Sequence, residues 1–274
     1  MRLNFPLSLN SHGSLRYTIR DDDVEIDPTF CDPTNLIVST SICDQRGHFL
    51  TSSVGYGYRL DRRNDAINPT RGFYLDFNQD LAGIGGDVKY VRTEAEGAWY
   101  HGFNKTFILS ITGSAGDIEG WGGDHVRIND RFYKGGNSFP GFQTAGIGPR
   151  DLTFANTGTN QNDALGGKAY AISSAELTVP TFLPEQYGIR AAVFTYVGAE
   201  GLLDSFDKKT TDTTTGLSII NPLIKDDFGL RASAGLSIFW KSPMGPIRFD
   251  FSQILKKEDY DRTETFRFST NTRF

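Results

Sequence analysis

The feature of this sequence that most constrains its fold is the alternation of apolar and polar residues, which recurs along most of the chain. A period of two residues predicts β-strands whose two faces meet different surroundings. We count about eleven such segments and none with the period of a long amphipathic helix. The predicted strands lie at residues 3–7, 14–26, 48–61, 73–81, 87–100, 107–114, 169–179, 189–197, 230–240, 247–252 and 266–274. This pattern predicts an all-β protein.

The predicted strands are long and their polar faces carry charge. Many cover roughly 9–13 residues, as strands that cross a bilayer do, whereas strands of soluble domains average about 5–6. Arg231, Arg248 and Asp250 lie on polar faces, where burial in a dry core would be costly. A water-filled interior accepts them, and lipid accepts the opposite apolar faces. We therefore predict an antiparallel transmembrane β-barrel with the lipid bilayer as a partner; the alternative is a soluble β-sandwich that serves as a binding module.

The charge and the first residues of the chain limit its function further. A formal net charge of −5 argues against a nucleic-acid partner, which requires a basic face. The first ten residues, MRLNFPLSLN, lack the continuous apolar core of a secretory signal. Because an exported protein should carry such a signal, we expect this chain to be a piece of a longer one.

Few residues suggest covalent chemistry. Cys31 and Cys43 bracket a short loop and fit a disulfide made in an oxidising compartment, with two unrelated thiols as the alternative. The four histidines do not stand at metal-ligand spacing. Ser138 and Ser173 have no nearby histidine that would activate a nucleophile. We predict no metal site, no cofactor and no enzymatic activity.

A glycine-rich stretch, DRFYKGGNSFPGFQTAGIGPRD at residues 130–151, interrupts the alternation. It belongs to a loop that runs from about 119 to 168 between two predicted strands. Loops longer than about 12–15 residues without secondary structure are usually functional or disordered. This one carries aromatic residues, among them Phe132, Phe139 and Phe142, which a disordered linker would lack. We expect the loop to fold back and pack inside the wall of strands.

Four segments resemble the C-terminal barrel of BamA-type outer-membrane protein assembly factors, in the surface antigen superfamily. They are RFYKGGNSFPGFQTAGIGPRD at 131–151, NPTRG at 68–72, SPMGPIRFDFSQIL at 242–255 and FRFSTNTRF at 266–274. The resemblance covers essentially the whole chain. It implies a bacterial outer-membrane barrel of sixteen strands, preceded by soluble periplasmic repeats. Counted back from its end, this chain would begin near the sixth strand, so residues 1–274 would form a partial barrel domain of about eleven strands.

The resemblance also implies a function, the folding and insertion of β-barrel proteins into the outer membrane. Its partners would be unfolded outer-membrane proteins as clients, together with assembly lipoproteins. The last strand, with Phe266, Phe268 and Phe274, would form one side of a weak seam whose unpaired backbone groups template an incoming strand. The chain would then be an assembly domain, or a degenerate or truncated copy of one. A small passive outer-membrane pore, closed by parallel pairing of the first and last strands, is the alternative.

The family's long loop tucks into the barrel, and an arginine at its tip meets acidic groups on the wall. The corresponding loop residues are Arg131, Phe132, Gly135, Gly136, Phe139, Pro140, Gly141, Phe142, Gly146, Gly148 and Pro149. Pro140 stands at the position of the arginine, and the wall positions fall at Glu176 and at Tyr196, where the family usually has an acid. We expect Glu176 to face the interior without a partner. Three explanations stay open: a drifted copy, a paralogue whose tip is held by Phe139 and Phe142, or an engineered or truncated form.

Overall fold

The computed structural model describes residues 1–31, 38–104, 106–153, 162–181, 183–184, 187–211, 218–242 and 245–270. Its main element is one antiparallel sheet of eleven strands, in the order β1-β2-β3-β4-β5-β6-β9-β10-β14-β15-β16. These strands are β1 (Arg2–Ser8), β2 (Ser11–Val24), β3 (Gly47–Asp61), β4 (Arg71–Ala82), β5 (Tyr90–Gly102), β6 (Ile108–Gly120), β9 (Ala169–Val179), β10 (Ile189–Gly201), β14 (Arg231–Ser242), β15 (Gly245–Lys256) and β16 (Phe266–Thr270). Each predicted strand corresponds to one of them, so the all-β prediction and its strand count are confirmed.

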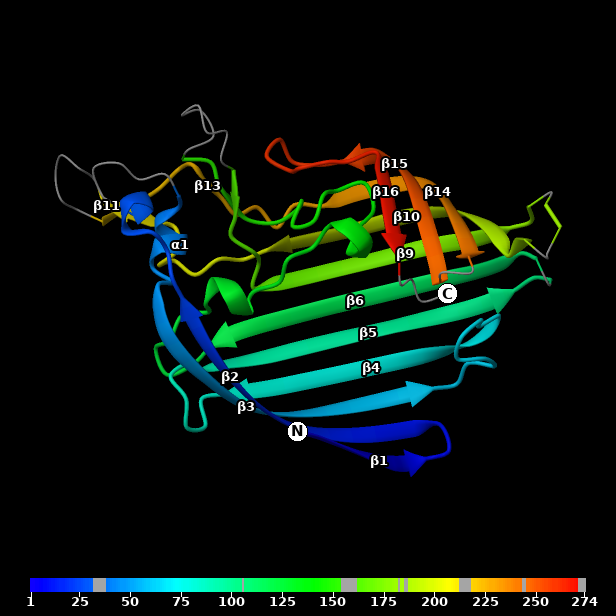
Figure 1. Cartoon of the computed structure of the whole chain (residues 1–274), viewed down its shortest axis with the longest axis horizontal. Coiled ribbons are helices and arrows are strands. Elements are labelled where there is room, and N and C mark those ends of the chain that lie inside the picture. The colour runs from blue at the N-terminus through cyan, green and yellow to red at the C-terminus, as the bar shows by residue number, and fades with distance from the viewer. Residues whose placement is uncertain are drawn as a thin grey trace.

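The sheet curves into a deep trough rather than a closed ring. Figure 1 shows the strands side by side, from β1 near the N-terminus to the orange and red strands near the C-terminus. Within the described residues β1 and β16 are the two edges and do not pair with each other. The parallel closure expected for a small passive pore is therefore not observed. None of the helices in the described ranges has both the length and the apolar character needed to span a membrane.

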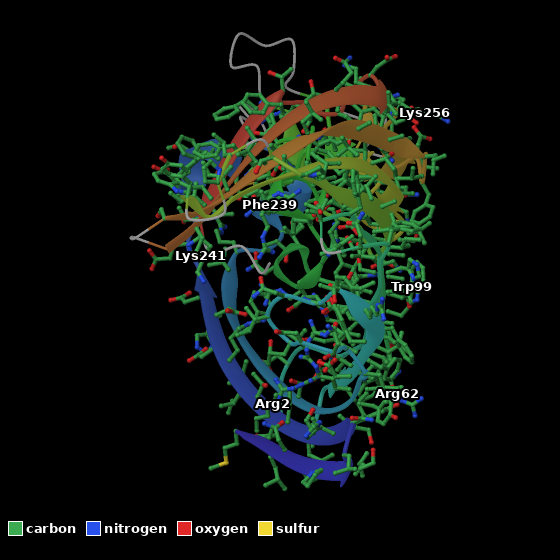
Figure 2. All side chains as sticks on the ribbon, turned by 90° about the vertical axis from the view of Figure 1, so that its right-hand side faces the viewer. Arg2, Arg62, Trp99, Phe239, Lys241 and Lys256 are labelled. Carbon is green, nitrogen blue, oxygen red and sulfur yellow. A yellow bond between two sulfur atoms is a disulfide. The ribbon has the colours of Figure 1, made fainter. Side chains whose placement is uncertain are left out.

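The two faces of the sheet differ as the alternation predicts. Leu236 and Phe268 on the outer face are 57% and 53% exposed, whereas Arg231 on the inner face is fully buried. In Figure 2, Trp99 points outward from the wall and Phe239 faces the concave interior. A sandwich would cover one face with a second sheet, but this large sheet leaves its apolar outer face bare. The sandwich alternative is wrong for the described residues.

Within the described residues, the small elements belong to the connections at one end of the trough. They include a second sheet, β13-β7-β8, and a third, β11-β12. The bounds are β7 (Arg150–Asp151), β8 (Asp163–Ala164), β11 (Lys209–Thr211), β12 (Ser218–Ile220), β13 (Ile224–Lys225), α1 (Thr40–Cys43), and the 3₁₀ turns η1 (Pro28–Cys31), η2 (Ile128–Asp130) and η3 (Gly136–Ser138). The long loop is thus less irregular than its sequence suggested, because β7 and β8 pair within it.

The main hydrophobic core lies between the sheet and this loop. Phe132, Phe139, Phe142 and Ile147 of the loop pack with wall residues such as Tyr170 in one buried cluster. A polar barrel interior offers no apolar core of its own. Burial of these aromatic side chains therefore depends on the loop's entering the trough.

Candidate functional site

The candidate site is the inserted segment, which the structure describes over residues 121–153 and 162–168, together with the wall that it contacts. It connects β6 and β9, which are antiparallel neighbours in the sheet. A turn of a few residues can join such neighbours, so the connection itself does not require a segment of this length. Figure 1 shows the green chain of the inserted segment on the concave side of the strands, and Figure 2 shows it within the curve of the sheet. The prediction that the loop folds inward agrees with this placement.

The two limbs of the inserted segment are tied together where they enter the trough. Phe132 and Gly167 exchange backbone hydrogen bonds, both 2.9 Å. The buried Arg131 guanidinium donates to the carbonyl oxygens of Val126 and Leu165, at 2.9–3.1 Å. It also lies 2.7 Å from Asp207 Oδ2, although no N–H is aligned on that oxygen. Arg131 thus joins both limbs to a neighbouring loop.

Several glycines of the inserted segment adopt conformations that other residues avoid, and Gly135 and Gly141 show why. Gly135 has φ +122°, and a Cβ there would lie 2.1 Å from the carbonyl oxygen of Gln143. Gly141 has φ +100°, and its Cβ would lie 2.8 Å from Ile254 Cδ1. Left-handed backbone and close approach both favour glycine. The sequence motif therefore reflects a tight backbone path against the wall.

Other glycines of the motif and Pro149 lie in close contact with neighbouring parts of the protein. The Arg267 guanidinium carbon would be 3.1 Å from a Cβ at Gly136. The carbonyl of Gly146 accepts the Arg262 N–H at 2.9 Å, and that of Pro149 accepts the Leu165 N–H at 2.9 Å. Gly148 packs against a buried glutamate of β10. These contacts show why the motif extends over the whole stretch rather than its tip alone.

The tip, Phe139-Pro140-Gly141-Phe142, is held without charge. Phe139 and Phe142 are fully buried, and their rings meet edge to face at 5.1 Å. Phe139 also packs on Tyr196, with ring centroids 5.8 Å apart. Ser233 Oγ donates to the Pro140 carbonyl at 2.6 Å. Aromatic pairs of this kind contribute about 0.5–1.5 kcal/mol beyond area burial, so packing accounts for a seated tip.

Glu176 has a partner, and the expectation that it would lack one is wrong. Its Oε2 lies 3.2 Å from Nη2 of Arg248 on β15, three strands further along the sheet. Arg248 also contacts Asp250 at 2.7 Å. The curvature of the sheet brings these side chains together across the concave face. Their inner-face positions could be predicted from the alternation, but their pairing could not.

Sequence reasoning missed several residues that hold the segment. Ser233 and Glu264 contact its tip, where the Glu264 N–H donates to the Gly141 carbonyl at 3.0 Å. Arg262 contacts the backbone just after the tip. Ser233 belongs to β14, and the other two precede β16. Residues so far apart in the sequence meet only in the folded trough. The alternation of polar and apolar residues could have placed Ser233 on the inner face, but it offered no such sign for the other two.

Burial affects the titration of loop groups in the inserted segment. It raises the pKa of Tyr133 to about 12. Burial, reinforced by the nearby positive charge of Arg262, lowers the pKa of Arg150 to about 10. Burial likewise lowers the pKa of Lys134, against the attraction of Glu94 and Glu200. Of these three groups, Arg150 is the most deeply buried, at 1% exposed.

Ser39, which lies between the disulfide-bonded cysteines of the β2–β3 connection, contacts the inserted segment. Cys31 and Cys43 are bonded, with Cα atoms 5.7 Å apart. Inside this disulfide-closed loop, Ser39 Oγ donates to Asp151 Oδ2 at 2.6 Å, and the Ser39 N–H donates to Asp163 Oδ2 at 3.1 Å. The two serine contacts thus reach both strands of the β7–β8 pair.

The last described strand presents an unpaired edge. β16 pairs with β15 through Phe266 opposite Phe251 and Phe268 opposite Phe249. Both β16 phenylalanines point outward and are about half exposed, at 49% and 53%. Phe274 lies outside the described residues. The far side of β16 has no neighbouring strand in the part of the chain that the structure describes.

Comparison with known proteins accounts for this arrangement of a curved wall, an inward loop and an open last strand. The model of the Omp85 superfamily domain matches residues 1–274. This chain belongs to the Omp85 superfamily. The bacterial outer-membrane location predicted from the sequence is confirmed by this membership together with the similarity to bacterial outer membrane protein assembly factors.

Similar Omp85 proteins include assembly factors from bacteria and animals. The outer membrane protein assembly factor BamA of Neorickettsia risticii (strain Illinois) is 30% identical over 269 residues, which are 95% of this chain and 33% of that protein. BamA of Neisseria meningitidis serogroup B is 28% identical over 84% of this chain and 29% of that protein. The bovine homologue of sorting and assembly machinery component 50 is 36% identical over 56% of this chain and 31% of that protein. The chain thus spans about a third of the length of these curated relatives.

A solved structure supports the Omp85 fold. The crystal structure of Haemophilus ducreyi BamA lacking POTRA domains 1–3 matches with a TM-score of 0.73 at 23% identity. The match covers 97% of this chain and 52% of that one. At this identity the likeness establishes the barrel fold, and the function has to be argued from the site.

Proposed function

We propose that residues 1–274 form an outer-membrane barrel domain that assembles other β-barrel proteins. The observation that best supports this proposal is the unpaired edge of β16, which lies beside an apolar, lipid-facing outer wall. Unpaired N–H and C=O groups on an edge strand pair readily with another extended chain. The names of the bacterial and animal relatives support the same role.

In this proposal a client strand adds to β16 by antiparallel backbone pairing. Phe266 and Phe268 keep the neighbouring surface apolar, so the client's own outer face enters lipid as it pairs. Each strand added supplies a new edge for the next one. The work consists of templating and binding, and it requires no cofactor, no bond-making residue and no nucleic acid.

The clients are unfolded outer-membrane proteins, and assembly lipoproteins are further partners in the proposal. A passive pore is a poorer explanation of the same geometry. The inserted segment fills the trough with a buried aromatic cluster, and β1 does not pair with β16 among the described residues. Both features oppose a closed, open-bore ring.

Site-specific cross-linking tests the proposal. The full chain carrying Thr270→Cys in β16 is placed in phosphatidylcholine liposomes with an unfolded barrel protein that has one cysteine in its last strand. We expect a mixed disulfide with the client and faster client folding than in empty liposomes. Leu236→Cys, on the outer face of β14 away from the edge, is the matched control and should cross-link weakly.

Two results would overturn the proposal. Equal cross-linking at 236 and 270 without faster folding would indicate an inactive copy. A stable ion conductance in planar bilayers with no client capture would favour the pore.

A further inference from the structure

Glu200 is a buried carboxylate that the proposed function does not use. It lies near the end of β10, beside Tyr170 of β9 in the register, and its side chain is completely buried. It makes no ion pair within the described residues. An ionised carboxylate placed there is costly unless hydrogen bonds replace its water. The hydrogen-bond partners of Glu200 therefore indicate its role.

Three parts of the inserted segment converge on Glu200. Oε2 accepts the Lys134 N–H at 2.9 Å, on the incoming limb. Oε1 accepts the Gly167 N–H at 3.1 Å, on the returning limb. Between them in the sequence, Gly148 lies so close that a Cβ there would be 2.7 Å from Glu200 Cδ.

The Glu200 contacts are specific to the shape and polarity of the carboxylate. Each oxygen faces a different backbone donor, so one side chain holds both limbs at once. Gly167 also leaves room for the glutamate stem, since its Cβ would lie 2.8 Å from Glu200 Cγ. The Lys134 ammonium group lies 3.5 Å from the centroid of the Tyr170 ring, which adds positive charge nearby.

The described residues of the tip receive no comparable contact from a wall carboxyl group. Pro140 carries no side-chain donor, Tyr196 packs on Phe139, and Glu176 is engaged by Arg248. The wall side chain that contacts both limbs is thus at the base of the segment, where the limbs lie side by side.

We propose that Glu200 is the positioning residue that clamps both limbs of the inserted segment to β10 and so seats the tip against β14. Loss of the carboxyl group removes the hold of β10 on the two limbs and lets the tip leave the wall. This inference concerns the position of the segment and holds whether or not the chain assembles other proteins.

A cross-link between the tip and the wall measures that position. Pro140→Cys and Ser233→Cys are introduced together, because the Pro140 carbonyl and Ser233 Oγ are 2.6 Å apart. The full chain is folded into detergent micelles and oxidised for a fixed time, and the 140–233 disulfide is quantified by peptide mapping, which separates it from the Cys31–Cys43 bond. Retained fast migration of unheated samples on SDS gels shows that the barrel stays folded.

In this background we expect Glu200→Ala to lower the cross-link yield at least about fivefold. Glu200→Gln, which keeps the shape and one acceptor, should lie between Glu200→Ala and the parent. Asp250→Asn is the matched control, since Asp250 is equally buried but its hydrogen-bond partners, Ser237 and Arg248, both belong to the wall. It should cross-link like the parent.

The isosteric Glu200→Gln variant keeps the test decisive if Glu200→Ala fails to fold. A folded Glu200→Gln protein that cross-links at the parental yield would overturn the proposal. So would an equal loss of yield in Asp250→Asn, because the effect would then reflect general weakening of the wall.

Discussion

At the scale of single residues, the inserted segment is held by complementary shape and by backbone hydrogen bonds. Phe139 and Phe142 are buried without charge, and Gly135 and Gly141 take backbone conformations that a side chain would strain. The proline at the tip is compatible with this arrangement, because the contact from Ser233 uses its carbonyl oxygen. Packing of this kind is what the paralogue explanation for the missing arginine predicts.

Replacing that proline by arginine should not improve docking. Pro140 is almost fully buried, and the nearest wall acid predicted for it, Glu176, is already paired with Arg248. An unpaired buried charge costs about 3–5 kcal/mol. We expect Pro140→Arg to lower the free energy of unfolding in urea by a few kcal/mol and Tyr196→Asp with Pro140→Arg to recover part of the loss. A full gain from the single change would contradict this interpretation.

At the scale of elements, the loops at one end of the trough fasten the inserted segment from outside. The disulfide-closed loop contacts Asp151 and Asp163 through Ser39. The loop after β10 contacts Lys168 and Val126 through Asp204, at 2.8 and 3.2 Å. Each of these contacts joins residues from two different connections between strands, so the position of one loop depends on the position of another.

Removing the disulfide should increase the mobility of the β2–β3 connection. A native disulfide usually contributes about 2–4 kcal/mol, mainly through the unfolded chain. We expect Cys31→Ser with Cys43→Ser to increase protease cleavage in residues 25–46 while the eleven strands stay protected. The measurement is limited proteolysis followed by mass spectrometry, with Phe103→Ser in an exposed turn as the control. Unchanged cleavage in 25–46 would show that the serine contacts suffice.

The Asp204 contacts should weaken at low pH. Burial opposes ionisation of Asp204, but hydrogen bonds from Lys168 and Val126 outweigh it and hold its pKa below the ordinary 3.8. A carboxyl with a depressed pKa stabilises the folded state above its unfolded pKa, and this contribution is lost as pH falls through the folded value. The difference in unfolding free energy between parent and Asp204→Asn should therefore be constant from pH 7 to 5 and shrink below about pH 4. Urea titrations across this range provide the measurement, and a difference that grows on acidification would refute the assignment.

At the scale of the whole molecule, one curved sheet separates an apolar outer face from a polar, partly filled interior. Leu236 is 57% exposed on the outer face, whereas Glu96 lies exposed on β5 among inner-face residues. This separation predicts that a charged substitution is more destabilising on the outer face than on the inner face. Arginine on the lipid face of a barrel costs about 2–4 kcal/mol near the bilayer midplane.

Leu236→Arg should therefore lower the stability of the liposome-folded protein by about that amount. Glu96→Arg, which places the same side chain on the inner face, should change it by less than about 1 kcal/mol. The measurement is urea-dependent unfolding in liposomes followed by tryptophan fluorescence. Equal effects at the two positions would mean that the outer face does not meet lipid.

The sequence by itself determined the strands and the side of the wall that each residue faces, because a period of two depends only on the strand backbone. It also determined that residues 130–151 carry an aromatic, glycine-rich loop. Only the tertiary structure decided that Glu176 meets Arg248 and that Glu200 receives both limbs of the inserted segment. Those partners come from separate strands and loops, and it is the register and curvature of the folded sheet that bring them within hydrogen-bonding distance.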